Sequence, residues 1–499
     1  MNLRMKPIAI VIGLSMGAAL FCPRAGADVF EYVNEEGKTV EVEARLAGSG
    51  QGAHALELAD GHIEIIPQAA VKKRTAQAGP EPLDAEAVVK QLSERFGAET
   101  FRSASGAPYI VGVVLSAPLP KKSQRRTDAL LKKAVGYMKS IDATFTRFAK
   151  DVRFTLEPPR HSLVVLIFET DTDFNKYTKE NSSGRGLSAT NIAGFYSPQT
   201  NYLAIRMHEC RDFATPLHEA IHQLCFNRNV FQRLAPIPIW FGEAIATAFE
   251  GDGKRIKVGP SKISTTYARQ VPAARRLSWN NIVSEDKAFR GDVLAGEAYT
   301  HAWSLHWLLF TKHKDAYARY LKSLSKLQPL QKADSSARLE EFEEAFEVQP
   351  TELHKTFKTI FPSAVKRQRI VMVDKTKRVG LATTESNSAQ VQMSAINRSL
   401  LGGGLEVQGS IRNVSPIRPK TFYVTVETSA GTYADWLIPN LAMSKSVALK
   451  KQIVRKLMAG GRGGPSNTFR VRVRSVVPGS REEIEWRNGG VPVPSLRPQ

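Results

Sequence analysis

The chain has 499 residues, of which 42% are hydrophobic, and it carries a formal net charge of +21. This length excludes a single ordinary domain and predicts two to four, and the hydrophobic content is that of globular proteins. The positive charge favours anionic partners such as a cell-envelope surface, with a solvated basic surface as the alternative. No nucleic-acid-binding motif accompanies the charge, so we do not expect nucleic acid as a partner.

Residues 1–27 have the pattern of a secretory signal peptide. Two basic residues precede a short apolar run from Ile8 to Phe21, which is below the ~20 residues that a membrane span needs. Ala25-Gly26-Ala27 fits a cleavage site with small residues. We therefore expect an exported, periplasmic or extracellular protein that begins at Asp28 and has no transmembrane helix. A lipid anchor at Cys22 and a retained amino-terminal anchor are the alternatives.

Residues 28–78 alternate short strand-like runs with turns. Thr39–Ala44 has the period-two pattern of a strand, and Asp60-Gly61 is a hairpin turn before the strand-like Ile63–Pro67. This pattern resembles a small SH3-like barrel, similar to the Sla-type homology domain of secreted bacterial proteins, and the resemblance implies a binding or positioning role. Gly79–Pro82 marks a linker.

Residues 83–385 form the predicted central domain. Two apolar runs predict strands at Tyr109–Leu115 and Leu163–Phe168, separated by a long amphipathic helix over Arg126–Lys150. Ser182–Gly186 reads as a polar loop. Ile192–Arg206 predicts a hairpin that turns at Ser197–Thr200. Further helices are predicted over Ala316–Leu324, Arg338–Phe346 and Thr351–Ile360.

The sequence His218-Glu219-Ala220-Ile221-His222 lies in an apolar, helix-compatible run. In a helix, His218 and His222 are one turn apart and about 40° apart around the axis. Two imidazoles at this spacing can hold one Zn²⁺, and Glu219 between them can reach a water on the metal. The spacing therefore predicts a zinc site.

A third ligand is needed to complete the site. Cys225 and Arg228 stand where the long metzincin motif requires Gly and His, which excludes that form. Within Pro236–Glu250 a second helix is predicted, entered after a proline-rich turn and with Glu243 in its first turn. Two His and one carboxylate leave a fourth position for water, as in catalytic zinc sites. The alternative is a buried helix with two hydrogen-bonded His and an unrelated Glu.

At these residues the sequence resembles the gluzincin metallopeptidases, the thermolysin-like clan. It matches a bacterial branch with His-Glu-Ala-x-His-Gln-Leu followed by a helix containing Trp-x-x-Glu-x-x-Ala. The resemblance implies that His218, His222 and Glu243 are zinc ligands and that Glu219 is the general base and acid. Many thermolysin-like enzymes have an Asp four residues after the ligand Glu, holding a ligand His. Thr247 stands at that place, and a hydroxyl orients an imidazole less firmly.

The gluzincin resemblance also suggests residues around the metal. The family's small sheet has an edge strand that pairs with extended substrate, so Asn201–Ile205 or its hairpin partner is a candidate for that role, with an ordinary paired strand as the alternative. Related enzymes carry a Tyr or His that stabilises the oxyanion, which makes Tyr299 and His301 candidates. Both lie on a strongly predicted helix over 299–309, where a packing role is the alternative.

Two cysteines remain in the chain predicted after cleavage, Cys210 and Cys225. An exported location permits a disulfide between them. The alternatives are two buried thiols and a Cys ligand to the metal.

The carboxy-terminal part is predicted to be β-rich. Residues 386–399 read as a polar loop, and Gly402–Gly404 extends this linker. Residues 400–499 alternate in the manner of an Ig-like β-sandwich, with strands at Leu405–Ile411, Thr421–Glu427 and Phe469–Val476. Arg470, Arg472 and Arg474 give the last strand a cationic face.

Taken together, the sequence predicts an α+β protein. A gluzincin domain with a small sheet and a helical lower half is flanked by an SH3-like barrel and an Ig-like sandwich. The predicted function is zinc-dependent hydrolysis of peptide bonds in a peptide or protein substrate. The alternatives are an envelope-binding or scaffold protein with a vestigial or structural zinc site, and an amidase that acts on wall peptide.

Overall fold

The computed structural model describes most of the chain. The described residues are 28–76, 80–181, 193–211, 214–251, 259–290, 294–332, 334–370, 372, 381–384, 388–398, 404–428, 433–455 and 469–490. Predicted positions that lie outside them include the signal peptide at 1–27, Gly79 of the first linker, the loop Ser182–Gly186, Ile192 at the start of the predicted hairpin, and the linker residues Gly402 and Gly403.

The first part of the structure is a five-stranded antiparallel sheet, here called the amino-terminal β-region (residues 28–76). Its strands are β1 (Asp28–Val33), β2 (Thr39–Gly50), β3 (Ala53–Glu57), β4 (Ile63–Pro67) and β5 (Val71–Ala76), in the order β4-β3-β2-β1-β5. Phe30, Ala44, Leu56 and Ile66 form its small buried core. The strands predicted from period-two alternation are confirmed, and so is the turn at Asp60-Gly61.

A second sheet lies at the centre of the molecule. Its strands are β6 (Phe101–Gly106), β7 (Tyr109–Val114), β8 (Leu163–Phe168), β9 (Gly194–Tyr196) and β10 (Tyr202–Arg206), in the order β6-β7-β8-β10-β9. The three inner strands β7, β8 and β10 are parallel, whereas β6 and β9 are antiparallel to their neighbours. The predicted hairpin around Ser197–Thr200 is confirmed as β9 and β10.

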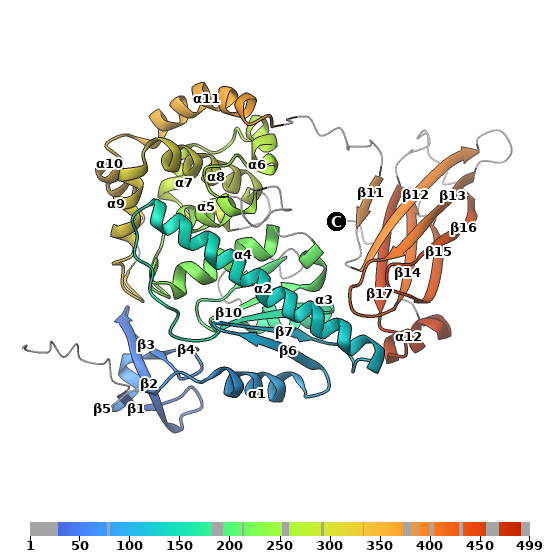
Figure 1. Cartoon of the computed structure of the whole chain (residues 1–499), viewed down its shortest axis with the longest axis horizontal. Helices are drawn as coiled ribbons and strands as arrows, with labels where there is room; N and C mark the ends of the chain where they lie inside the picture. Colours follow the sequence, from blue (N-terminus) through green and yellow to red (C-terminus); the bar gives the residue numbers. More distant parts are fainter. Residues whose placement is uncertain are drawn as a thin grey trace, which may run out of the picture.

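Helices cover both faces of the central sheet (Figure 1). The helices are α1 (Ala85–Phe96), α2 (Lys121–Asp151), α3 (Asp171–Asn181) and α4 (Ala214–Asn227). Strand β8 is apolar throughout because alternate side chains serve different cores: Val165 packs with α2 and α4, and Leu166 packs with α1 and α3. The sheet is therefore a rigid support for α4, the helix that carries the His-Glu-x-x-His motif.

The remaining central helices pack together on the side of α4 that faces away from α1 and α3 (Figure 1). They are α5 (Ile239–Glu250), α6 (Thr265–Gln270), α7 (Trp279–Ser284), α8 (Ala295–Lys312), α9 (Lys314–Leu324), α10 (Arg338–Phe346) and α11 (Pro350–Arg367). All helices predicted in this part from helical periodicity are confirmed.

The last part, here called the carboxy-terminal β-region (residues 381–490), contains two sheets that share one apolar core. One sheet has the order β11-β17-β14-β15 and the other β12-β13-β16. The strands and helix are β11 (Leu381–Thr384), β12 (Ala389–Arg398), β13 (Gly404–Asn413), β14 (Lys420–Thr428), β15 (Tyr433–Leu441), β16 (Ser446–Arg455), β17 (Phe469–Val476) and α12 (Arg481–Glu485). The predicted strands at 405–411, 421–427 and 469–476 are confirmed.

The predicted loop over residues 386–399 is wrong, because most of it is strand β12, antiparallel to β13. Ala389 and Met393 are buried in the core, whereas Gln390 and Gln392 between them are exposed. The strand alternates, but small and polar side chains make that alternation weak in the sequence.

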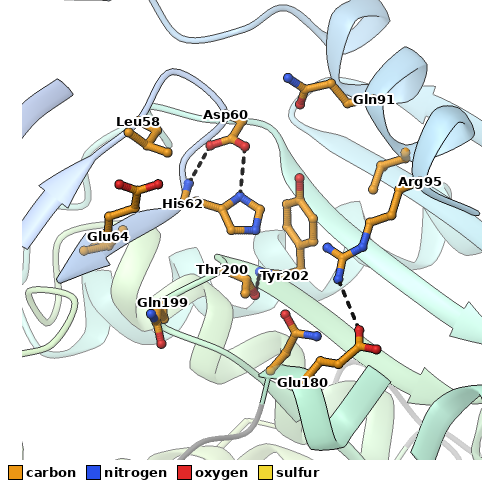
Figure 2. Close-up of a pocket in the computed structure, with 13 residues that line it drawn as sticks. Leu58, Asp60, His62, Glu64, Gln91, Arg95, Glu180, Gln199, Thr200 and Tyr202 are labelled. Carbon is orange, nitrogen blue, oxygen red and sulfur yellow. Dashed lines mark hydrogen bonds and ion pairs between the residues drawn. The ribbon is translucent and has the colours of Figure 1, made fainter. Parts of the chain in front are cut away.

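The amino-terminal β-region is docked firmly on the central part. The Ile63 backbone N–H donates to the Gln199 carbonyl (2.8 Å), and the buried Glu57 carboxylate lies 3.2 Å from Arg233 Nη1. Arg233 also donates to the Pro198 and Gln199 carbonyls. A pocket of about 480 Å³ lies at this junction, between the β3–β4 turn, α1, α3 and β10 (Figure 2). These contacts fix the turn between β9 and β10 against β3 and β4.

A buried ion cluster joins the carboxy-terminal β-region to the central part. Arg418 Nε and Lys420 Nζ lie 2.7 and 2.8 Å from Glu169 Oε1, and the three side chains are 3%, 2% and 0% exposed. Ser116 donates to the other Glu169 oxygen from its backbone N–H and its hydroxyl. Because the carboxylate is buried and paired, removing either side of the cluster would leave an unpaired charge.

At the coarse level, the described residues form a mixed α+β fold with several small sheets and twelve α-helices. No helix within these residues has the length and apolar character required to span a membrane.

Candidate metal centre

Helix α4 presents two different faces. Leu217, Ile221 and Leu224 have no exposed surface and anchor the helix in the largest core. His218 and His222 lie one turn apart on the neighbouring face and point towards α5. The apolar face thus fixes the direction in which both imidazoles project.

Helix α5 supplies the carboxylate. It begins after Pro238, a residue that leaves no backbone N–H unsatisfied at a helix start. The Asp286 carboxylate accepts from the Ile239 backbone N–H (3.1 Å) and is itself paired with Arg338. This capping fixes the start of α5, and Glu243 lies in the second turn, facing α4. The prediction that placed Glu243 in the first turn is wrong, because the helix begins at Ile239.

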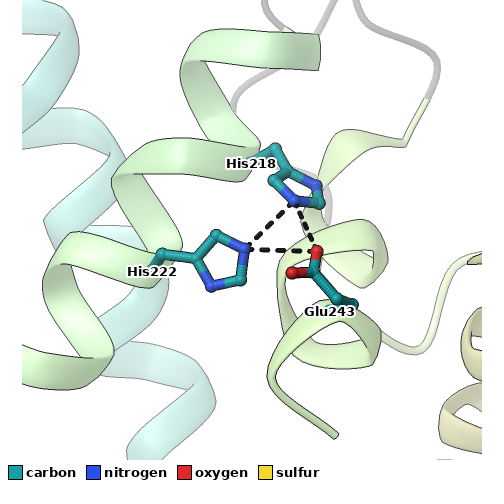
Figure 3. A group of neighbouring side chains, drawn as sticks. All are labelled: His218, His222 and Glu243. Carbon is teal, nitrogen blue, oxygen red and sulfur yellow. Dashed lines mark hydrogen bonds and ion pairs between the residues drawn. The ribbon is translucent and has the colours of Figure 1, made fainter. Parts of the chain in front are cut away.

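The structure brings the three predicted ligand side chains together (Figure 3). The two Nε2 atoms of His218 and His222 are 3.1 Å apart. Glu243 Oε2 lies 3.0 Å from His218 Nε2 and 3.4 Å from His222 Nε2. Ligand atoms about 2.0–2.1 Å from a tetrahedral Zn²⁺ lie about 3.3 Å from each other. The three observed separations therefore fit one face of such a tetrahedron.

The second nitrogen of His218 has a partner that the sequence reading missed. Glu250 Oε1 lies 2.8 Å from His218 Nδ1, and the Tyr267 hydroxyl donates to the same oxygen (3.0 Å). A carboxylate at this place holds the proton on Nδ1 and leaves the Nε2 lone pair directed at the metal position. Glu250 follows Glu243 by two helical turns, so helix periodicity could have indicated it.

Thr247, which stands where the resemblance suggested an orienting residue, does not take this role. It is fully buried, and its hydroxyl donates to the Ala244 carbonyl of its own helix (3.0 Å). Glu250, one turn further along α5, orients His218 instead.

The electrostatic balance of the cluster favours positive charge. Burial opposes charging of His218, but hydrogen bonds with Glu243 and Glu250 outweigh it and raise the pKa of His218 well above its usual value. Burial likewise opposes the charged form of Glu243, yet the two imidazoles hold its pKa well below the ordinary range. The donor set therefore suits a cation.

Glu219, the predicted base, lies against the sheet edge. Its Oε2 accepts from the Tyr196 backbone N–H of β9 (2.8 Å), and the residue is 7% exposed. A Cβ on Gly194 would lie 3.0 Å from the Ala204 carbonyl oxygen and 3.5 Å from Glu219 Cγ, so the glycine suits the close packing of β9 against β10 and α4. Glu219 is thus positioned by both α4 and β9.

The two candidate positions for a substrate-pairing strand can be separated. Strand β10, which contains most of Asn201–Ile205, lies between β8 and β9 and has neighbours on both sides. It is therefore an ordinary paired strand and cannot receive another. Its hairpin partner β9 is the outermost strand of this sheet within the described residues.

A cleft of about 470 Å³ opens beside the cluster, and His222 and Glu243 form part of its wall. Most of the other lining residues are apolar or aromatic: Ile65, Phe195, Tyr196, Pro198, Phe226, Phe231, Leu234, Ile237, Pro238, Ile239, Phe289 and Tyr299. Tyr299 also has its ring centroid 6.1 Å from that of His218. Of the two oxyanion candidates, Tyr299 faces the cleft.

His301 has a different environment. It is 3% exposed, and its Nδ1 accepts from the Trp279 indole N–H (3.1 Å), while its Nε2 lies 3.6 Å from Glu297. It does not contribute to the described cleft wall. Burial lowers the pKa of His301 despite the nearby Glu297. The structure therefore favours the packing role for His301.

Cys210 and Cys225 are thiols and are not joined in a disulfide. Cys225 is buried, and burial raises the pKa of its thiol. The cluster of His218, His222 and Glu243 does not include it.

Residues 212–331 match a known family. Its description is "Protein of unknown function (DUF1570)". The matched stretch contains the three clustered side chains together with Glu219, Glu250 and Tyr299, but not the amino-terminal β-region. A search of curated proteins finds no match.

Proposed function

We propose that this chain is an exported zinc-dependent peptidase. The observation that carries the proposal is the convergence of His218, His222 and Glu243, whose ligand atoms lie within 4.8 Å of one another, with His222 and Glu243 in the wall of a cleft. A zinc ion held by these residues would supply a Lewis acid and lower the pKa of a water molecule.

The chain's own residues supply the remaining chemistry. Glu219, held by the Tyr196 backbone, takes the proton of the attacking water and delivers it to the leaving amine. Tyr299, which lines the same cleft, donates to the oxyanion. Strand β9 pairs with the extended substrate and places its scissile bond beside Glu219. The apolar lining excludes water from the rest of the cleft.

The same proposal assigns the three parts of the fold. The central sheet with α4 and the helical lower half correspond to a gluzincin peptidase domain. The amino-terminal β-region corresponds to an SH3-like barrel and the carboxy-terminal β-region to an Ig-like sandwich. The residue pattern at 1–27 supports export, and the net charge of +21 supports contact with an anionic envelope surface.

The test combines metal analysis with peptide cleavage. The purified wild type is expected to hold one equivalent of zinc and to cleave members of a mixed peptide library detected by mass spectrometry. Glu219→Gln should keep the zinc and lose hydrolysis, whereas His218→Ala should lose both. Full activity of Glu219→Gln would refute the mechanism. One equivalent of zinc without cleavage of protein or wall peptides would favour an envelope-binding protein with a structural zinc site.

A further inference from the structure

The cleft beside the cluster of His218, His222 and Glu243 is here called the metal cleft. One of its walls includes a residue from outside the central part of the structure. Ile65, on β4 of the amino-terminal β-region, lines the same cleft as His222 and Glu243. Its side chain is 45% exposed, which makes it one of the few large apolar residues on the described surface. Ile66 is buried in the core of its own region, whereas Ile65 lies on the opposite face of β4, which it shares with Ile63 at the junction with the central part.

The position of Ile65 is fixed rather than loosely tethered. Two residues before it, Ile63 donates its backbone N–H to Gln199, in the turn that leads from β9 to β10. The Glu57–Arg233 pair holds the same turn, and the two side chains are only 6% and 8% exposed. Separating a charge pair with so little solvent exposure costs free energy, because each charge would be left buried without its partner. The amino-terminal β-region and β9 therefore form one continuous wall.

The cleft also continues along this wall. Asn181 and Gln199 line both the metal cleft and the pocket at the junction. Figure 2 shows Asp60, His62 and Glu64 projecting from the β3–β4 turn and β4 into that pocket, opposite α1. The His62 ring contacts Tyr202 of β10, with 4.9 Å between ring centroids. A substrate paired along β9 would thus meet β4 on one side.

We infer that Ile65 is a specificity-determining residue of the metal cleft and selects a substrate residue with a large apolar side chain. The inference rests on the proposed function and deepens it. Its physical basis is shape and apolar surface: Ile65 faces a lining that includes Phe226, Phe231 and Leu234. An apolar substrate side chain gains free energy by leaving water there, and a charged one loses it.

The test compares Ile65→Ala with a matched control. Val447 on β16 is also an exposed β-branched residue on a strand, 37% exposed, and it lies in the carboxy-terminal β-region. The full-length, zinc-loaded wild type, Ile65→Ala and Val447→Ala are each given internally quenched peptides. These share one sequence and vary a single position among Ala, Leu, Phe and Glu, for each position around the cleaved bond.

At one position the wild type is expected to prefer Leu and Phe over Ala and Glu. Ile65→Ala removes three carbon atoms from the wall, so the ratio of kcat/KM for Leu over Ala should fall about fivefold at that position. It should be unchanged at the other positions and in Val447→Ala. Equal preference profiles for the wild type and Ile65→Ala would overturn the inference.

A binding measurement separates this inference from the hydrolase proposal. The same peptides are titrated into zinc-loaded Glu219→Gln, with and without Ile65→Ala, and their dissociation constants are compared. If the wild type cleaves nothing but Ile65→Ala still reduces the discrimination between Leu and Ala, the hydrolase proposal fails and the role of Ile65 stands. If no peptide binds, or discrimination does not depend on Ile65, the inference fails.

Discussion

Replacing Glu250 by Gln should weaken zinc binding although Glu250 is not one of the three ligands. Its carboxylate lies 2.8 Å from His218 Nδ1, and the two side chains are only 15% and 12% exposed. A hydrogen bond to a charged group contributes about 1.5–3 kcal/mol, against about 1 kcal/mol for a neutral pair. Glu250→Gln removes the charge of this group but keeps its hydrogen bond to His218. The free energy of zinc binding should therefore weaken by about 1.4 kcal/mol, which is about tenfold in affinity.

The affinity can be measured by competition with a chromogenic chelator at pH 7, with circular dichroism to verify folding. Thr247→Val is the matched control, because Thr247 is buried on the same helix and its hydroxyl bonds only within α5 among the described contacts. Its zinc affinity should stay within about threefold of the wild type. If Glu250→Gln binds zinc as tightly as the wild type, or if Thr247→Val has the larger effect, the orienting role of Glu250 is wrong.

Three further predictions concern catalysis, the junction between the carboxy-terminal β-region and the central part, and the pH dependence of stability. Glu219→Gln should lower kcat for peptide cleavage by at least ~100-fold with zinc content unchanged, since it removes the proton acceptor; stopped assays with metal analysis check this, and a fall below tenfold would contradict it. Glu169→Gln should destabilise the protein by about 3–5 kcal/mol in chemical unfolding, because Arg418 and Lys420 lose their buried counter-charge; an unchanged midpoint would contradict it. His306 is fully buried, and burial lowers its pKa to about 3. The folded state therefore binds this proton more weakly than the unfolded state, whose pKa is about 6.5, and the stability present above pH 6.5 is lost as pH falls towards 3. Between pH 7 and 5 the wild type should lose about 2 kcal/mol more unfolding free energy than His306→Gln, and equal losses would refute this.

The pairing of the two histidines proposed as metal ligands was predictable because their positions follow from local rules. The i, i+4 spacing of His218 and His222 needs only helix geometry, and the apolar residues of α4 predict that helix. Glu243 required the family resemblance, since nothing local says which helix faces α4. The structure supplies that contact and brings its carboxylate to the two imidazoles.

Other features depend on tertiary contacts that no local pattern carries. Helix periodicity places Glu250 on the same face of α5 as Glu243, but only the packing of α5 against α4 brings its carboxylate to His218. Ile65 reads as a strand residue, and only the docking of β4 shows that it lines the metal cleft. Strand β12 was missed because its alternation uses Ala, Gln and Ser, where β-propensity is low.

The ion cluster at Glu169 limits how this protein can be recombined with others. A chimera that grafts a foreign β-sandwich onto the central part would leave the Glu169 carboxylate facing a dry interface without Arg418 and Lys420. Such a graft would need either two cations at the same places or a neutral residue at 169. The joint at this end of the molecule therefore depends on a matched set of charges, and the flanking part cannot be exchanged by shape alone.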